Sequence, residues 1–373
     1  MTGPPRFSGI LEIDPKRFGF VREISHGMAR EQHDPFVPPS LISQFQLRPG
    51  VVIEGTVSPS SGKRNSRESR SPQVASIETV NGLTPDVWRE LTEFSRHEVV
   101  SPHQLIRLEG RGSNISARIV ELFCPVGRGQ RALLVSPPKA GKTMLMQQLA
   151  HAISLHNPDV VLLVLLIDER PEEVTDMRRS IKGEVFASSS DSERGDHVRL
   201  AQLILEYAKR KVETGADVVI MMDSLTRMGR AFNVHQKSSG RTMSGGVDIR
   251  ALEIPKRLFG AARNIETGGS LTIIATALIE TNSRMDDLIF QEFKGTGNME
   301  LVLDRGLADE RLFPAINLGQ SGTRREELLF GPAAQQHQAL RRSIARLSPR
   351  EAMLTVQKLI AQFPTNAELL ARF

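Results

Sequence analysis

The chain has 373 residues and a formal net charge of +5, with 39% hydrophobic and 24% charged residues. This composition excludes a chain that is disordered throughout, and the length suits one large and one small domain. The positive charge favours a polyanionic partner. The single cysteine, Cys124, excludes an internal disulfide framework and a multi-cysteine metal site, and we expect it as a core side chain in a reducing cytoplasm.

No segment of the sequence indicates membrane insertion. The longest strongly apolar run, 160–167, is far shorter than the roughly 20 residues that a spanning helix needs. The start, Met1-Thr-Gly-Pro-Pro-Arg6, lacks the apolar stretch of a secretory signal. We therefore expect a cytoplasmic protein without a membrane partner.

The first 80 residues consist of short alternating segments separated by Gly and Pro, including 9–13, 17–22 and 51–57. This pattern predicts a small β-barrel. Segment 60–72 has almost no apolar residues and a basic bias, so it is predicted to be a mobile loop, either merely solvated or in contact with RNA. A helical connector is expected around 86–93.

The rest of the chain alternates apolar runs with segments of helical spacing. The runs 132–135, 160–167, 218–222 and 271–277 are near-continuous, which indicates strands buried on both faces of a parallel sheet. Segments 143–155 and 198–213 have one apolar face and are predicted to be helices. The larger domain is therefore expected to have an α/β fold.

A phosphate-binding loop follows the first apolar run, in Ser136-Pro-Pro-Lys-Ala-Gly-Lys-Thr143. In such loops backbone N–H groups surround an anion, a lysine adds charge at the β and γ phosphates, and a hydroxyl binds Mg²⁺. We assign the last two roles to Lys142 and Thr143. Ser136 replaces the usual first glycine, and Lys139 is either a second charge for the phosphates or a solvent-facing lysine. ATP and Mg²⁺ are the implied cofactors.

Acidic residues end two of the apolar runs, where ligands of open α/β sheets collect. Asp223 follows run 218–222 and is a candidate to hold Mg²⁺ or its water shell. Asp168 and Glu169 follow run 160–167, and one of them is expected to orient or deprotonate the attacking water. The sequence does not orient either side chain, and we favour Glu169.

Several segments resemble the family of bacterial transcription termination factor Rho, ring-shaped RNA-dependent ATPases with a RecA-like motor domain. They are Pro125-Val-Gly-Arg-Gly-Gln-Arg131, the phosphate loop, Leu165-Leu-Ile-Asp-Glu-Arg-Pro-Glu-Glu-Val174, Met222-Asp-Ser224, Gly260-Ala-Ala-Arg-Asn264, 269–278, 292–301 and 321–328. The resemblance implies an OB, cold-shock-like barrel over 5–82, a connector over 83–104 and a RecA-like ATPase domain over 105–373.

The resemblance also implies roles for individual residues. Glu169 would be the catalytic carboxylate, Asp223 the metal-associated acid, and Arg324 an arginine finger that enters the neighbouring subunit's site. Arg227 would be a second interface arginine, and Phe313 would pack on adenine. Nucleotide contacts are implied for Pro138, Lys139, Ala140, Gly141, Lys142, Thr143, Met144, Arg170, Arg227 and Phe313.

Two regions are implied to bind single-stranded RNA. In the motor domain, loop 237–246 with Arg241 and Thr242 and loop 280–286 with Arg284 would face the central hole of the ring. In the barrel, Phe18 and Phe20 alternate along one strand and Phe36 lies on a later strand, beside basic residues that suit base stacking. The alternative is that these rings form a buried aromatic pair.

The barrel departs from the family pattern in one region. The family usually has an acidic residue and a tyrosine on a late barrel strand that help to select cytosine, whereas Arg67-Glu-Ser-Arg-Ser-Pro72 has no aromatic residue. The helical bundle that often precedes the barrel is also not expected here. RNA loading is therefore expected to be weaker, less selective for bases, or more dependent on the basic loop.

We expect a homohexameric RNA-dependent ATPase and helicase that translocates along nascent RNA, engages the RNA polymerase elongation complex and ends transcription. One alternative is another RecA-like motor, such as a rotary-ATPase subunit or a protein-export ATPase. A second alternative is an RNA-binding paralogue that hydrolyses ATP without terminating transcription.

Overall fold

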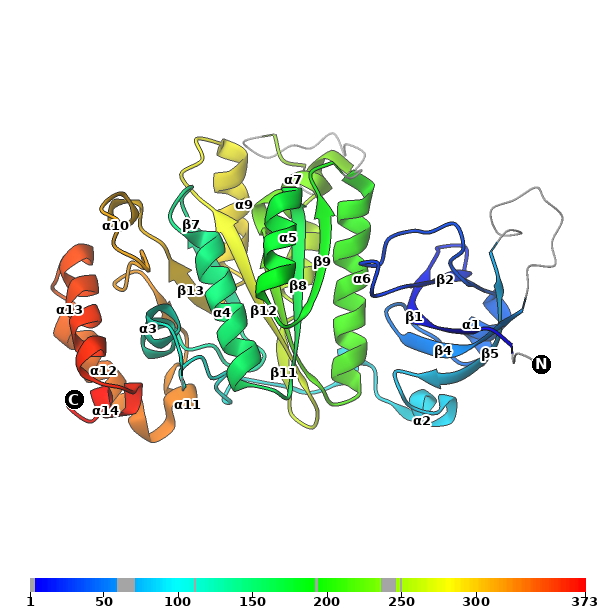
Figure 1. Ribbon diagram of the computed structural model, residues 1–373, viewed down its shortest axis with the longest axis horizontal. Helices are drawn as coiled ribbons and strands as arrows, with labels where there is room; N and C mark the ends of the chain where they lie inside the picture. Colours follow the sequence, from blue (N-terminus) through cyan, green and yellow to red (C-terminus); the bar gives the residue numbers. More distant parts are fainter. Residues whose placement is uncertain (1–3, 59–70, 111, 192–193, 236–245, 249) are drawn as a thin grey trace. The chain divides into compact units, whose positions relative to one another are not determined.

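The computed structural model describes residues 4–58, 71–110, 112–191, 194–235, 246–248 and 250–373 (Figure 1). The chain forms two compact units. The smaller unit contains the residues up to Glu98 with Arg199–Ala216 and Thr267–Gly269, and the larger contains Val99–Val198, Asp217–Glu266 and Ser270–Phe373. Within the described residues, no helix combines the length and apolar character needed to cross a bilayer.

A closed barrel with the strand order β1-β2-β3-β5-β4 lies in the smaller unit. Its strands are β1 (Arg6–Ile13), β2 (Gly19–Arg22), β3 (Phe36–Val37), β4 (Val52–Ser58) and β5 (Gln73–Val80). Alternate side chains point inward, and the core includes Leu11, Val21, Val37, Ile53 and Val74. This confirms the expected OB-like barrel. The unit also contains helices α1 (Pro39–Gln44) and α2 (Pro85–Glu90) and a 3-10 turn, Phe94–Arg96.

Strand β2 is shorter than the predicted segment 17–22. A tight turn precedes it, in which the backbone N–H of Arg17 donates to Asp14 O and that of Asp14 donates to Phe18 O, both at 2.8 Å. Arg17 has a φ of 68°, which turns the chain away from an extended conformation. Phe18 therefore lies at the end of the turn, and Phe20 lies within the strand.

A nine-stranded sheet forms the centre of the larger unit, with β14-β13-β7-β12-β10-β8-β9 in order, β11 beside β12, and β6 beside β11. The strands are β6 (Val99–Val100), β7 (Arg131–Ser136), β8 (Val160–Glu169), β9 (Glu184–Ser189), β10 (Asp217–Asp223), β11 (Arg263–Ile265), β12 (Ser270–Leu278), β13 (Met299–Val302) and β14 (Gly322–Thr323). From β13 to β9 all neighbours are parallel. The four apolar runs are β7, β8, β10 and β12, as predicted.

Helices flank this sheet, with α4 and α5 in front of the strands in Figure 1. The helices that lie wholly in the larger unit are α3 (Ile115–Phe123), α4 (Lys142–His156), α5 (Pro171–Ser180), α7 (Leu225–His235), α8 (Glu253–Phe259), α9 (Arg284–Lys294), α10 (Arg305–Asp309), α11 (Glu327–Phe330), α12 (Ala334–Ile344), α13 (Pro349–Gln362) and α14 (Asn366–Leu370), with a 3-10 turn at Gly331–Ala333. Helix α6 (Arg194–Glu213) belongs to the smaller unit from Arg199 onward. The predicted helices 143–155 and 198–213 correspond to α4 and α6.

Cys124 lies in the apolar core of the larger unit, as expected from the sequence. Its side chain is fully buried beside Leu122, Phe123 and Val126. Burial raises the pKa of its thiol to about 12, so it is a structural and not a reactive cysteine.

Candidate nucleotide and RNA sites

The phosphate loop connects β7 to α4 at the carboxyl edge of the sheet. Gly141 caps the helix with a φ of 86°, a left-handed conformation that favours glycine. Lys139 also has a positive φ, 65°, so the loop curls before the helix starts. Ser136, in place of the usual glycine, is fully buried and donates its hydroxyl to Pro137 O at 2.8 Å. The substitution therefore leaves no unpaired hydroxyl.

The residues of the loop differ in how they meet solvent. Pro138 and Lys139 are exposed and Ala140 is buried. Thr143 lies half-buried in the first turn of α4, where backbone N–H groups are available to an anion. Met144 is 60% exposed.

Lys142 and Asp223 meet across the sheet because β7 and β10 both adjoin β12. Lys142 Nζ donates to Asp223 Oδ1 at 2.5 Å and also contacts Oδ2. The Thr276 hydroxyl, from β12, donates to Asp223 Oδ1 at 2.7 Å. Asp223 is almost fully buried, so the lysine and the hydroxyl stabilise a charge that burial alone would disfavour.

Glu169 ends β8 beside this pair, and its carboxylate has one unpaired oxygen. Oε1 lies 3.1 Å from Arg227 Nη1, whereas the buried Oε2 has no hydrogen-bond partner among the described residues. Arg227 also donates to Asp168 O. Asp168 has a φ of 55°, and the pairing with β9 shifts register between Ile167 and Glu169. This irregularity leaves Asp168 half-exposed and buries Glu169.

The environment of Glu169 favours its protonated form. Burial and then the negative charge of Asp223 raise the pKa of Glu169 to about 7, although Lys142 and Arg227 lower it. A carboxyl group with a pKa near neutrality suits proton transfer at physiological pH.

An apolar pocket of about 470 Å³ adjoins the phosphate loop. Its walls include Ile115, Met144 and Phe313. Phe313 is 43% exposed, and a Cβ atom placed at Gly141 would lie 3.2 Å from its ring. A flat, apolar wall next to a phosphate loop suits a purine base.

Three of the arginines predicted for the functional sites are exposed to solvent, and one of them lies at the opposite edge of the sheet from the phosphate loop. Arg170 is exposed and caps α5, and Arg284 is exposed at the start of α9. Arg324 is exposed and follows β14, beside the amino end of β7, whereas the phosphate loop follows its carboxyl end. Arg324 therefore does not belong to the phosphate site of its own subunit.

Phe18, Phe20 and Phe36 form one aromatic cluster on the barrel. Their ring centroids lie 5.8 Å apart for Phe18 and Phe20, and 5.7 Å for each of these with Phe36. All three rings are half-buried. The cluster thus combines both sequence-based alternatives, since the rings pack on one another and still reach solvent.

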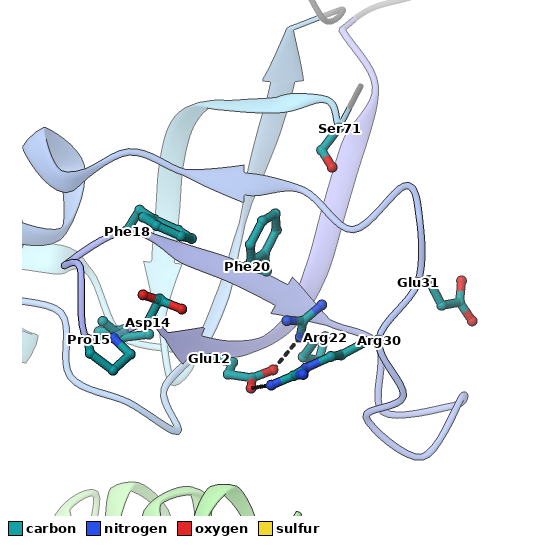
Figure 2. Close-up of a pocket in the computed structure, with 10 residues that line it drawn as sticks. Glu12, Asp14, Pro15, Phe18, Phe20, Arg22, Arg30, Glu31 and Ser71 are labelled. Carbon is teal, nitrogen blue, oxygen red and sulfur yellow. Dashed lines mark hydrogen bonds and ion pairs between the residues drawn. The ribbon is translucent and has the colours of Figure 1, made fainter. Parts of the chain in front are cut away.

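A pocket of about 310 Å³ opens beside Phe18 and Phe20 (Figure 2). Figure 2 shows Glu12 joined to Arg22 and Arg30, and the Arg22 guanidinium lies 5.0 Å from the Phe20 ring centroid. Burial raises the pKa of Glu12, but the charges of Arg22, Arg199 and Arg30 outweigh burial and hold the pKa below its usual value.

The sequence did not single out Thr276, Glu12 or Asp34. Asp34 is buried and pairs with Arg22, and Thr276 lies in a continuous apolar strand. For Thr276, the only signal in the sequence was a polar residue inside a run of buried apolar residues. Arg241, Thr242 and Arg67-Glu-Ser-Arg70 lie outside the described residues, whereas Ser71, which follows them, lines the barrel pocket.

The described residues contain no cluster of three His, Cys, Asp or Glu side chains that could hold a metal ion. Mg²⁺ usually takes few protein ligands and completes its shell with phosphate oxygens and water. A hydroxyl and a carboxylate, from Thr143 and Asp223, fit that ligand set, and the unpaired Glu169 Oε2 marks an unfilled polar position nearby.

Two family models match the chain. The Rho termination factor RNA-binding domain matches residues 7–86, which contain the barrel. The nucleotide-binding domain of the ATP synthase alpha/beta family matches residues 116–323, which contain the phosphate loop.

The solved structures with a similar fold include secretion ATPases. An ATPase from the type III secretion system of pathogenic bacteria has a TM-score of 0.54 and 26% identity, covering 68% of this chain and 69% of its own. The assembled ATPase of the enteropathogenic E. coli type III secretion system has a TM-score of 0.55 and 24% identity, covering 74% of this chain and 61% of its own, and shows the fold alone. The larger unit therefore has a RecA-like ATPase fold.

Similar sequences include several transcription termination factors Rho. The Aquifex aeolicus protein is 48% identical over 97% of this chain and 83% of its own length, and the Streptosporangium roseum protein is 48% identical over 97% and 91%. The Borreliella burgdorferi protein is 51% identical over 87% of this chain, which spans 62% of that longer relative. With the barrel and the ATPase site in one chain, these matches show that the chain belongs to the transcription termination factor Rho family.

Proposed function

We propose that the protein is a homohexameric, RNA-dependent ATPase and helicase that moves along nascent RNA and terminates transcription. The observation that carries this proposal is one chain that holds both the Lys142, Asp223 and Glu169 cluster and the aromatic pocket of the barrel. Its partners would be single-stranded RNA and the RNA polymerase elongation complex. We propose a cytoplasmic location, where nascent RNA of bacteria is made.

The nucleotide would bind with its phosphates on the loop and its base against Phe313. Lys142 would release Asp223 and contact the β and γ phosphates, because a triphosphate carries more negative charge than one carboxylate. Thr143 and Asp223 would then hold Mg²⁺, which when bound neutralises charge on the phosphates. Pro138, Ala140 and Met144 would shape the loop around the phosphates.

Glu169 would orient the attacking water and accept its proton. Its unpaired Oε2 supports this role, because a buried carboxylate oxygen without a protein donor is available to water. Arg227 would hold the carboxylate in place through Oε1 and link it to the adjoining subunit. Arg170, exposed beside Glu169, would add positive charge at the nucleotide.

Arg324 would act on the nucleotide of the neighbouring subunit. Its position at the amino edge of the sheet supports this role, since one subunit's phosphate loop and arginine lie at opposite edges. A guanidinium that arrives from another subunit stabilises charge developing on the γ phosphate and couples hydrolysis to ring geometry.

RNA would first contact the barrel, where Phe18, Phe20 and Phe36 would stack on bases. It would then pass to Arg284 and to the loop with Arg241 and Thr242 in the ring. The Rho RNA-binding domain match over residues 7–86 and the exposure of Arg284 support this path.

The test is ATPase activity in the presence of each homopolymeric RNA. We expect strong stimulation by single-stranded RNA, with little preference for cytosine because Arg67-Glu-Ser-Arg-Ser-Pro72 contains no aromatic residue. Hydrolysis at full rate without RNA would contradict the proposal and would favour another RecA-like motor.

The lack of an aromatic residue in the barrel segment 67–72 favours a second candidate function, that of an RNA-stimulated ATPase that does not terminate transcription. Release of transcripts from stalled elongation complexes distinguishes the two. RNA-stimulated hydrolysis without transcript release would establish the second candidate.

A further inference from the structure

Two hydrogen bonds tie the backbone around Arg324 to the central sheet and its neighbouring loop. Its N–H donates to Asn298 O at 2.9 Å. The preceding residue, Thr323, is buried and donates its hydroxyl to Pro125 O at 2.7 Å. Arg324 is therefore the first exposed residue after a fixed strand, β14.

Asn298 is itself clamped to the amino end of β7. Its Oδ1 accepts hydrogen bonds from Arg131 N at 2.9 Å and from Gln130 Nε2 at 2.6 Å. Gln130 Nε2 also donates to Asn298 O at 3.1 Å, and Asn298 N donates to Arg131 O at 3.0 Å. Gln130 is 1% exposed. Hydrogen bonds with Gln130 and Arg131 thus fix the position of Asn298, whose carbonyl accepts the hydrogen bond from Arg324 N.

The guanidinium of Arg324 lies close enough to that of Arg131 for the two positive charges to repel each other. Arg131 places its guanidinium against Thr296 O at 2.9 Å and Ala262 O at 3.2 Å. Burial lowers the pKa of Arg131, and the nearby charges of Arg263 and Arg324 lower it further. Among the described residues no carboxylate forms an ion pair with Arg324. Its guanidinium is therefore available to bind an anion outside its own subunit.

We propose that Asn298, Gln130 and Thr323 are positioning residues that hold Arg324 rigidly at the subunit edge for the neighbouring subunit's nucleotide. This inference rests on the proposed role of Arg324 in trans. Its physical basis is that a catalytic group misplaced by about 1 Å costs on the order of 100-fold in rate.

The test is a double-mutant cycle on the RNA-stimulated ATPase of the full chain. Asn298→Ala should lower kcat by about 100-fold with KM for ATP nearly unchanged, because the nucleotide pocket of its own subunit is untouched. In the Arg324→Ala background the same substitution should lower kcat no further, because the clamp acts only through Arg324.

Asn157→Ala is the matched control. The Asn157 side chain accepts a hydrogen bond from Arg107 N and donates to Arg107 O and Ile153 O, so none of its hydrogen bonds involves β14. Its effect on kcat, whatever its size, should be the same in the wild-type and Arg324→Ala backgrounds. If Asn298→Ala does not fold, Thr323→Val, which keeps the side-chain shape, replaces it in the cycle with a smaller expected loss.

The outcomes separate the two ideas. Equal losses from Asn298→Ala, or from Thr323→Val, in both backgrounds would overturn the positioning role and leave the trans role of Arg324 intact. A normal kcat for Arg324→Ala alone would instead overturn the trans role proposed for Arg324.

Discussion

Glu169 carries the chemistry of the site through its surroundings more than through its identity. It is one of two adjacent acids, and only Glu169 is buried beside Asp223 with a free oxygen. The bulge at Asp168 determines this difference, because it turns consecutive side chains into different environments.

Activity is expected to fall as the pH drops below about 7. Burial and Asp223 raise the pKa of Glu169 to about 7, and a group that accepts a proton must be ionised, so the rate should fall about tenfold per pH unit on the acid side. The pH profile of RNA-stimulated hydrolysis at saturating ATP measures this. Glu169→Gln should abolish turnover at every pH.

A matched pair of variants checks the electrostatic cause. The charge of Glu173 raises the pKa of Glu169, so Glu173→Gln should shift the acid limb to lower pH. Glu172, exposed in the same turn, is not among the causes, and Glu172→Gln should leave the limb unchanged. An acid limb near pH 4.5 in the wild type, the ordinary value for a glutamate, would show that the pKa of Glu169 is not raised.

Phe313→Ala is expected to raise KM for ATP about tenfold and to leave kcat within a few-fold. The ring forms one wall of the pocket beside Gly141 and touches no predicted reacting group, so its loss removes binding shared by the ground and transition states. Steady-state ATPase kinetics measure both constants. A change in kcat alone would argue against a base-binding role.

Among the secondary-structure elements, the turn before β2 determines which aromatic side chains lie together on the barrel surface. It brings Phe18 next to Phe20, although the two lie on different elements, and Phe36 of β3 completes the cluster. Packing of the rings on one another limits their motion, so little conformational entropy remains to be lost when a base stacks on them.

Phe20→Ala is expected to weaken binding of single-stranded RNA by roughly 5- to 150-fold, the equivalent of 1–3 kcal/mol for one stacked base. The affinity for ATP should not change. Fluorescence anisotropy with labelled RNA measures the loss.

Phe7→Ala is the control for this variant. Phe7 is also half-buried and packs against the barrel core, but it does not line the pocket. It should lower the melting temperature and leave the RNA affinity of the folded protein near that of the wild type. Equal RNA losses in both variants would assign the effect of Phe20 to barrel stability.

At the scale of the whole molecule, the sheet separates the two halves of the proposed composite site. The phosphate loop follows the carboxyl end of β7, and Arg324 lies beside its amino end. A site that needs both requires two subunits, which gives a physical reason for a ring.

Arg324→Ala is expected to lower kcat about 1,000-fold while the hexamer still assembles, since the arginine would contact the transition state in trans. Mass photometry reports assembly, and ATPase assays report kcat. Arg325→Ala is the neighbouring control, because Arg325 is exposed but bonds to Ser101 and approaches Glu327 of its own chain. Loss of the hexamer in Arg324→Ala alone would assign the residue to assembly.

The sequence by itself predicted the main elements of the ATPase site, although it did not single out Thr276. The four buried strands, the phosphate loop and the acids at the strand ends follow from apolar runs and the residues that end them. The two aromatic residues of the barrel stand out in one short segment, although the turn at Arg17 and not alternation along a strand brings their rings together. These features depend on neighbours within a few residues, so a single chain read in order contains them.

The tertiary structure alone decided how distant residues meet. It paired Lys142 with Asp223, set Thr276 against that carboxylate, and put Phe313 beside Gly141. It also placed Arg324 at the far edge of the sheet, on the clamp formed by Asn298. These contacts depend on the order in which non-consecutive strands pair, and strand order is fixed by packing of the whole sheet, which no local pattern contains.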